Sequence, residues 1–191
     1  MTEQPLTIML VHAHPDDEVI STGGIALKYQ EQGARVVLVT CTRGEEGEIV
    51  DPELNTPENK ARLAEIRDVE LAEALKVLKI SDFHQLGYRD SGMINTPANE
   101  HPESFNKADL AAATGRLVEL VRRYRPQVLI SYNEEGGYGH PDHIAAHKIT
   151  VAAFHAAGDP EQYPEAGEPW APAKLYYTAW RRSIWRTAWE H

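Results

Sequence analysis

Short apolar runs alternate along the chain with longer segments in which apolar residues recur at helical spacing. The short runs suit buried strands. We predict strands at 6–12, 35–41, 82–87, 127–132 and 174–179. The helical pattern predicts helices at 22–32, 58–78, 109–124 and 142–156. This alternation predicts an α/β fold, a Rossmann-like and mainly parallel sheet with helices on both faces.

Polar loops follow several of the predicted strands. Residues 43–57 are rich in Gly, Pro and acids, residues 89–102 form a second polar loop, and 133–143 form a third. In open α/β sheets, ligands bind where loops leave the carboxyl ends of the strands. We therefore expect the functional site at that edge of the sheet.

Composition narrows the class of protein. The chain has 191 residues, of which 42% are hydrophobic and 25% charged, and it contains no repeat or linker, so we expect a single domain over 1–191. Acidic residues outnumber basic ones by 29 to 19, which argues against a nucleic-acid partner. A single cysteine, Cys41, excludes a disulfide framework and a Cys-based zinc finger.

The two ends of the chain bear on location and assembly. The N-terminal apolar run is too short for a signal peptide core or a membrane span, so we expect a cytoplasmic protein with no membrane partner. The last segment, 181–191, is aromatic and basic and contains Trp185 and Trp189. These side chains need a further segment or a partner subunit to cover them, so we expect a homo-oligomer.

The first group of chemically capable residues is His14-Pro15-Asp16-Asp17-Glu18, directly after the first strand. Pro15 favours extended geometry at His14, so the strand ends there. Neighbouring side chains on the following turn diverge, so one carboxylate can bind a metal while the other faces a substrate. Taken alone, Asp16 and Asp17 are better explained as a helix cap.

The second group, Gly136 to His143, follows the fourth strand. Zinc binds imidazole and carboxylate ligands, and a catalytic site keeps one position open for water. His14, Asp17 and one of His140 or His143 would supply such a set. Capping does not explain two His-Pro-Asp tripeptides at strand-to-helix junctions, because a cap has no use for histidine. His147 is a weaker candidate, and His12 is most simply a core histidine.

The runs AHPDDE at 13–18 and GHPDH at 139–143 resemble the zinc-dependent deacetylase family called LmbE-like or PIG-L. The resemblance covers nearly the whole chain. It is closest to the branch that contains the mycothiol-pathway deacetylase and the mycothiol S-conjugate amidase, on RGEEGEI (43–49), RDVELAEAL (67–75), YRDSGM (88–93) and GEPWAPAKLYY (167–177). Members of this branch usually run beyond this length, so we expect part of a C-terminal region to be missing from the chain.

The resemblance implies a role for each matching residue. His14, Asp17 and His143 match the zinc ligands, and Asp16 matches the general base. His140, as an imidazolium, matches the group that stabilises or protonates the tetrahedral species, and Asp142 the group that orients His140 or tunes its charge. Tyr138 matches a tyrosine that polarises the carbonyl. The positions that hold the sugar or polyol match Arg67, Asp90 and Glu48.

The resemblance therefore implies a zinc-dependent hydrolase that cleaves the amide of an N-acetylglucosamine-type conjugate into a free amine and acetate. Fe²⁺ suits the same ligands and is the alternative metal. Two alternative functions stay open: a mycothiol S-conjugate amidase and a non-catalytic metal- or sugar-binding domain. A nucleotide-binding Rossmann protein is disfavoured, because no glycine-rich phosphate motif follows the first strand.

Overall fold

A computed structural model describes residues 5–179 of the chain. Within these residues one parallel sheet has the strand order β3-β2-β1-β4-β5. Its strands are β1 (Thr7–His12), β2 (Arg35–Thr40), β3 (Asp82–Gln85), β4 (Val128–Tyr132) and β5 (Lys174–Thr178). The predicted α/β fold with a parallel sheet is confirmed, and each predicted strand is present to within two residues at either end.

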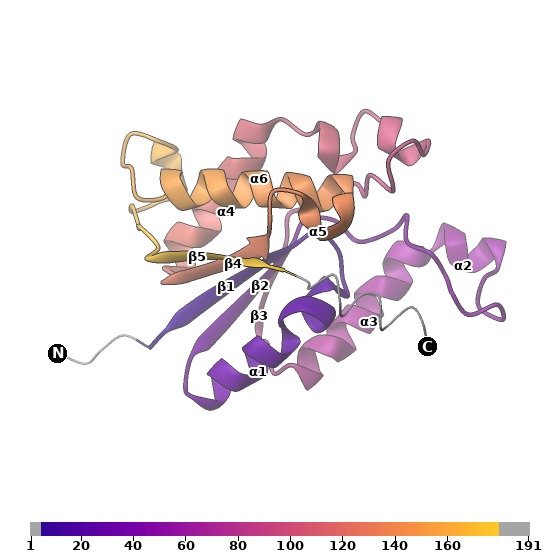
Figure 1. Cartoon of the computed structure of the whole chain (residues 1–191), viewed down its shortest axis with the longest axis horizontal. Coiled ribbons are helices and arrows are strands. Elements are labelled where there is room, and N and C mark those ends of the chain that lie inside the picture. The colour runs from indigo at the N-terminus through magenta and orange to yellow at the C-terminus, as the bar shows by residue number, and fades with distance from the viewer. Residues whose placement is uncertain (1–4, 180–191) are drawn as a thin grey trace.

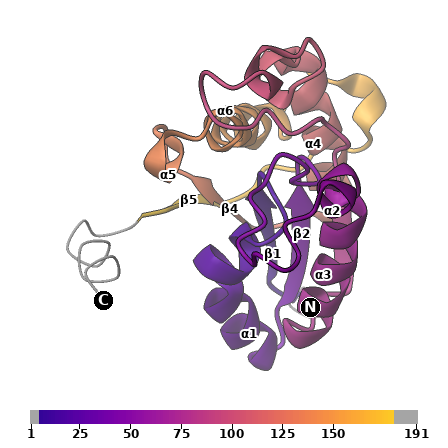
Figure 2. The ribbon, with the colours of Figure 1, turned by 90° about the vertical axis from the view of Figure 1, so that its right-hand side faces the viewer.

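Helices cover both faces of the sheet. The chain forms α1 (Gly23–Glu31), α2 (Pro57–Ala61), α3 (Leu63–Val77), α4 (Leu110–Tyr124), α5 (Gly136–Gly139) and α6 (Pro141–Ala156). Figure 1 shows α1 and α3 on one face of the sheet and α4 and α6 on the other, and Figure 2 shows the same layers from the side. Helices on both faces explain why the strands β1 and β2 are buried along almost their whole length.

The alternation of side chains along the central strand feeds two separate cores. Met9 and Val11 of β1 belong to a cluster that includes buried residues of α4 and α6. Ile8 and Leu10 point to the opposite face and join residues of α1 and α3. Because successive side chains of a strand alternate between faces, the apolar residues of β1 pack into both cores. This packing on two sides fixes the end of β1, from which His14 follows.

The predicted helix over 58–78 was wrong in one respect, since it is two helices. Arg62 leaves helical geometry, with φ −115° and ψ 15°, between α2 and α3. The apolar stripe begins only at Leu63, and α2 buries none of its residues. Because α2 has no apolar face to pack against the sheet, packing does not favour a continuous helix through Arg62.

A groove of about 800 Å³ runs along β1, β4 and β5 beside α1, over apolar side chains such as Ile8, Val128 and Ile130. None of the predicted site residues lines it.

In the described part of the chain, no helix has the length and apolar character needed to cross a membrane. Trp185 and Trp189 lie outside the described residues, so the homo-oligomer stays a prediction.

Candidate active site and metal centre

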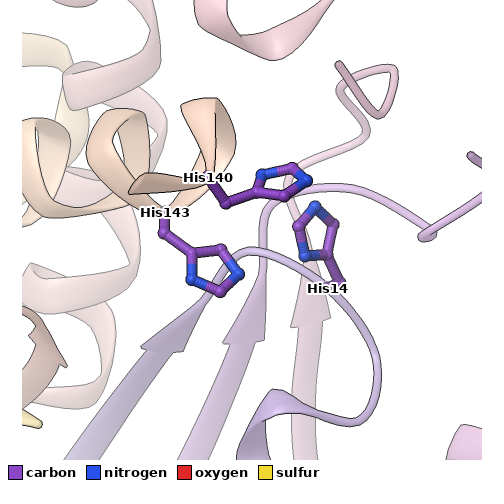
Figure 3. Close-up of side chains that lie close together, drawn as sticks. All are labelled: His14, His140 and His143. Carbon is purple, nitrogen blue, oxygen red and sulfur yellow. The ribbon is translucent and has the colours of Figure 1, made fainter. Parts of the chain in front are cut away.

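Two strand-to-helix junctions bring histidines together at the carboxyl edge of the sheet. His14 follows β1, and His140 and His143 open α6 after the neighbouring strand β4. The ring centroid of His14 lies 4.6 Å from that of His140 and 5.2 Å from that of His143. Figure 3 shows the three imidazoles turned toward one another. The prediction that the two motifs share one site is thus consistent with this geometry.

Asp17 lies between two of these histidines. Its Oδ2 is 3.4 Å from His14 Nδ1 and 3.4 Å from His143 Nε2. The same oxygen accepts hydrogen bonds from the His14 backbone N–H, at 3.1 Å, and from the Tyr132 hydroxyl, at 2.7 Å. The three predicted metal ligands therefore converge around one carboxylate oxygen.

The other nitrogen of each imidazole is already engaged. His14 Nε2 lies 3.1 Å from Asp142 Oδ2, and His143 Nδ1 lies 3.1 Å from the Gly136 carbonyl oxygen. Metal-binding histidines typically donate the second ring N–H to a carboxylate or carbonyl in this way. His143 Nε2 is buried and has no hydrogen-bond partner among residues 5–179. This donor set, two imidazoles and a carboxylate, fits a zinc-type ion.

The geometry also offers other sets of donors. One potential ligand atom from each of His14, His140 and His143 lies within 4.8 Å of the others. The same holds for His14, Asp90 and Asp142. His140 thus competes with Asp17 for the role of third ligand. The described residues could therefore hold a metal ion in more than one arrangement.

Carboxylates surround His14. Asp142 and Asp17 lie within 3.4 Å of its ring, and Asp90 Oδ1 lies 3.6 Å from Nε2. Burial opposes a charge on His14, yet hydrogen bonds to Asp142, Asp17 and Asp90 raise its pKa well above the usual value. Burial likewise disfavours charge on Asp17, but His14 and His143 hold its pKa well below the usual value. The site is an anionic environment that favours a cation.

Asp16 and Asp17 diverge, as predicted. The Asp17 side chain is 13% exposed and faces the histidines, whereas that of Asp16 is 55% exposed and pairs with Arg67. Asp16 has φ 106°, a strained conformation for a residue other than glycine. Its N–H donates to Glu18 Oε2 at 3.0 Å, which helps to hold that conformation. Burial raises the pKa of Asp16, while Arg67 opposes the rise.

The guanidinium of Arg67 makes several hydrogen bonds to other groups of the protein. Besides Asp16, its guanidinium donates to the carbonyl oxygens of Pro15, at 2.7 Å, and Gly44, at 2.9 Å. Arg67 therefore joins the loop after β1 to the loop after β2. Its predicted contact with a sugar stays a prediction.

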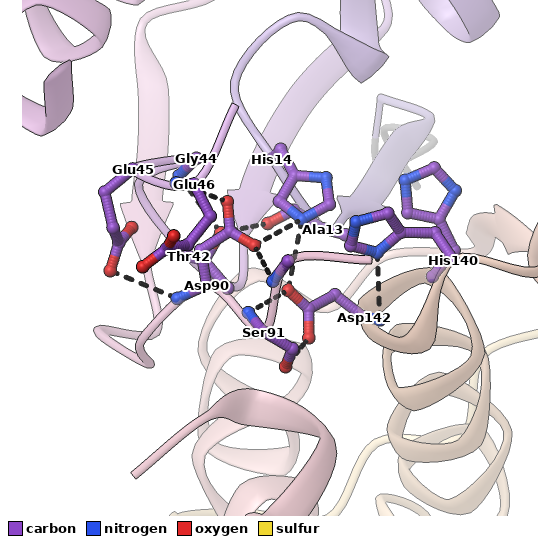
Figure 4. Close-up of polar contacts among 12 residues, drawn as sticks. Ala13, His14, Thr42, Gly44, Glu45, Glu46, Asp90, Ser91, His140 and Asp142 are labelled. Carbon is purple, nitrogen blue, oxygen red and sulfur yellow. Dashed lines mark hydrogen bonds and ion pairs between the residues drawn. The ribbon is translucent and has the colours of Figure 1, made fainter. Parts of the chain in front are cut away.

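Asp142 differs from the prediction. Its carboxylate is fully buried and contacts His14 Nε2, the Ser91 N–H at 2.9 Å and the Ser91 hydroxyl, as Figure 4 shows. Only its backbone N–H contacts His140, donating to Nδ1 at 3.1 Å. The carboxylate thus orients His14 rather than His140.

His140 also differs from the predicted imidazolium. Burial and the nearby His14 and His143 rings lower its pKa to about 3. Its Nδ1 accepts the Asp142 N–H at the first turn of α6, where the helix dipole further disfavours positive charge. The lowered pKa favours the neutral imidazole, and because Nδ1 accepts a hydrogen bond, the ring proton of that form is on Nε2. Tyr138 lies beside it, 61% exposed, with its ring edge-on to His143 at 5.0 Å.

The remaining predicted residues lie around this centre. Asp90 is buried and accepts the N–H groups of Glu46, at 3.1 Å, and Gly92, at 2.8 Å, so it joins two loops. Glu48 is exposed and lines a groove of about 390 Å³ together with Arg67 and Leu63. Their contact with a substrate stays a prediction.

Sequence reasoning overlooked Tyr132 and Ser91, which touch Asp17 and Asp142. Ser91 lies within the YRDSGM run and Tyr132 is the last residue of β4, and these positions were the available signals. Burial and the adjacent Asp17 raise the pKa of Tyr132 well above its usual value, so its hydroxyl keeps its proton. His12 is a buried core histidine, as predicted, and His147 supports the site by contacting the Tyr132 carbonyl oxygen at 2.9 Å.

Comparison with known proteins decides the family. The sequence profile of PIG-L, described as GlcNAc-PI de-N-acetylase, matches residues 9–154. The chain belongs to the PIG-L family. The match contains both junctions and therefore every residue of the histidine and aspartate cluster.

A curated relative of this chain is named a deacetylase. The chain is 53% identical over 183 residues to 1D-myo-inositol 2-acetamido-2-deoxy-alpha-D-glucopyranoside deacetylase 1 of Catenulispora acidiphila, covering 93% of this chain and 57% of that protein. The chain thus spans little more than half the length of this relative.

Solved structures share the fold of this chain. The conserved protein TT1542 from Thermus thermophilus is 28% identical, with a TM-score of 0.66 over 93% of this chain and 67% of that one. The N,N'-diacetylchitobiose deacetylase from Pyrococcus horikoshii, at 22% identity and a TM-score of 0.71, shares the fold over 96% of this chain and 67% of its own.

Proposed function

We propose that this PIG-L protein is a metal-dependent hydrolase, built as one catalytic domain, that removes the acetyl group from an N-acetylglucosaminyl conjugate. The observation that carries the proposal is Asp17 Oδ2 at 3.4 Å from both His14 Nδ1 and His143 Nε2, with Asp16 and His140 beside this set. The name of the Catenulispora relative supplies the conjugate to test first, the acetamido glucoside of myo-inositol.

His14, Asp17 and His143 would hold the metal. Two imidazoles and one carboxylate suit Zn²⁺, with Fe²⁺ as the alternative. When bound, the ion supplies a Lewis acid that polarises the acyl oxygen and makes a water molecule more acidic. Asp17 is preferred to His140 as the third ligand because its Oδ2 faces the free nitrogens of both other ligands.

Asp16 accepts the proton of the attacking water. Its carboxylate lies on the exposed side of the ligand set, near Asp17 and His14, and its raised pKa makes it a stronger base than an ordinary aspartate. The contact with Arg67 fixes its direction. General bases placed in this way typically contribute 10²–10⁴-fold to the rate.

Neutral His140 faces the developing oxyanion and donates from Nε2. A neutral donor serves this purpose because hydrogen-bond donors fixed in advance stabilise charge as it forms. Tyr138, on the exposed side, is a second donor. The water oxygen bonds to the acyl carbon, the carbon–nitrogen bond breaks, and the proton held by Asp16 goes to the amine. The products are acetate and the free amino sugar.

The groove next to Asp16 suggests which residues bind the sugar. We place the polar part of the conjugate along the groove that Glu48 and Arg67 line, next to Asp16. Asp90 supports this side of the site through its loop contacts.

The test is release of primary amine and acetate from the acetamido glucoside of myo-inositol, beside a mycothiol-type S-conjugate, with chelator and with zinc added back. Equal amounts of amine and acetate from the glucoside, lost with chelator and restored by zinc, support the deacetylase. Release mainly from the S-conjugate would favour the amidase. Zinc binding with release from neither would favour a non-catalytic domain.

A further inference from the structure

The hydroxyl of Tyr132 makes two hydrogen bonds in which donor and acceptor cannot be exchanged. Its hydroxyl oxygen lies 2.7 Å from the Ala13 backbone nitrogen and 2.7 Å from Asp17 Oδ2. The backbone N–H can only donate, so the hydroxyl accepts there and gives its single proton to Asp17. The phenol is thus a fixed donor to one carboxylate oxygen.

The ring of the same residue holds a second member of the cluster. Tyr132 is 3% exposed, and its ring stacks on that of His143 with centroids 4.1 Å apart and planes 15° apart. The Gly136 carbonyl oxygen fixes the His143 ring from the Nδ1 side. Tyr132 therefore contacts two proposed ligands at once and is tied to the backbone one residue before the third.

Ser91 repeats the arrangement on the opposite side. Its hydroxyl accepts the Asn106 backbone N–H at 2.9 Å and so donates to Asp142 Oδ1. The Ser91 backbone N–H donates to Asp142 Oδ2 at 2.9 Å, and that oxygen faces His14 Nε2 at 3.1 Å. With both Asp142 oxygens held, the carboxylate accepts a hydrogen bond from Nε2–H and so keeps Nδ1 of the His14 ring turned toward Asp17.

We propose that Tyr132 and Ser91 are positioning residues, two buried hydroxyls that orient Asp17, His143 and, through Asp142, His14 for metal binding. This inference rests on the ligand set proposed above. Each hydroxyl takes a backbone N–H and gives its proton to a carboxylate, so neither can reverse its direction. Ligands held in place before the metal arrives lose little freedom on binding, which increases affinity.

The first variant is Tyr132→Phe, which keeps the ring on His143 and removes only the hydroxyl. The second is Ser91→Ala, which removes the hydroxyl from Asp142. Each should weaken zinc binding by about 10–100-fold, the usual effect of losing a partner of a metal ligand. Both should also shift the visible absorption of the Co²⁺-substituted protein, because the orientation of the ligands changes.

Matched controls remove buried or half-buried hydroxyls elsewhere. Tyr124→Phe loses a hydrogen bond to His84 Nε2 at 2.6 Å, and Ser131→Ala loses one to the Val11 carbonyl oxygen at 3.0 Å. Both should keep the wild-type zinc dissociation constant and Co²⁺ spectrum. Circular dichroism and thermal melting identify any variant that does not fold, and Ser91→Ala, in a loop, carries the test if Tyr132→Phe does not.

The outcomes separate the two proposals. If the wild-type protein binds neither zinc nor Co²⁺, the proposed ligand set fails. If it binds both and the folded Tyr132→Phe and Ser91→Ala proteins keep its affinity and spectrum, the ligand set stands and the positioning role is overturned. Weaker binding and an altered spectrum in the two variants, with unchanged controls, support the positioning role.

Discussion

The two His-Pro-Asp tripeptides follow neighbouring parallel strands, yet the aspartate is exposed in the first tripeptide and buried in the second. After β1, His14 is buried in the cluster while Asp16, at φ 106°, points outward to Arg67. After β4, His140 caps α6 with its ring, and Asp142 is buried behind His14. The aspartate of the second tripeptide therefore serves the histidine of the first.

This difference shows that position on the turn, rather than residue type, decides the role. The strained turn at Asp16 separates two adjacent carboxylates, so that Asp17 faces the histidines and Asp16 faces solvent. The regular helix start at His140 instead turns Asp142 inward, where Ser91 and His14 share its oxygens. One junction exposes a carboxylate, and the other buries one against His14.

The largest expected effect comes from the outward carboxylate of the first junction. Asp16→Asn should lower kcat by about 10²–10⁴-fold, because the base is lost while the ligand set stays intact. Zinc content, measured by atomic emission, should stay at the wild-type value. Asp68→Asn, which removes the exposed carboxylate paired with Arg43, is the matched control and should keep wild-type kcat. Wild-type turnover in Asp16→Asn at full zinc loading would refute the role of Asp16.

A smaller effect tests the backbone of the second junction. Gly136 has φ +63°, and a Cβ there would lie 2.8 Å from His143 Cβ and 2.9 Å from the Ile144 nitrogen. Gly137 has φ +74° with open space around it. Gly136→Ala should lower the free energy of unfolding by about 2–5 kcal/mol, through strain plus crowding, and Gly137→Ala by about 1–2 kcal/mol through strain alone. Urea denaturation measures both, and equal losses would count against the crowding.

The last effect depends on pH and concerns His12, two residues before His14. His12 is fully buried, with Nε2 2.8 Å from Thr22 Oγ1, and burial lowers its pKa to about 4. The unfolded chain binds this proton near pH 6.5, so stability is complete above that pH and falls as the pH decreases to about 4. The loss is at most about 3 kcal/mol, from 1.36 kcal/mol per pKa unit.

Denaturation curves between pH 7 and 4 measure this loss. His12→Gln should flatten the pH dependence of the free energy of unfolding relative to the wild-type protein. His155→Gln, which changes an exposed histidine of α6, should leave the slope unchanged. An identical slope in His12→Gln and the wild-type protein would show that His12 does not contribute.

The sequence predicts the strands and most helices because continuous apolar runs such as 35–41 and stripes such as that of α4 reflect burial directly. It predicts the divergence of Asp16 and Asp17 because neighbouring side chains on a turn must separate. It could not predict that Asp142 supports His14, because that contact joins residues 128 positions apart. Nor could it predict the lowered pKa of His140, because that shift depends on burial and on the neighbouring His14 and His143 rings.

The central claim, that Asp17 and not His140 completes the ligand set with His14 and His143, is tested most directly by zinc binding to two variants. Equilibrium competition with a chromophoric chelator gives the zinc dissociation constants of Asp17→Ala and His140→Ala beside the wild-type protein. We predict that Asp17→Ala loses stoichiometric zinc, while His140→Ala retains it with nearly unchanged affinity. Retention by Asp17→Ala with loss in His140→Ala would contradict the claim and assign the metal to the three histidines.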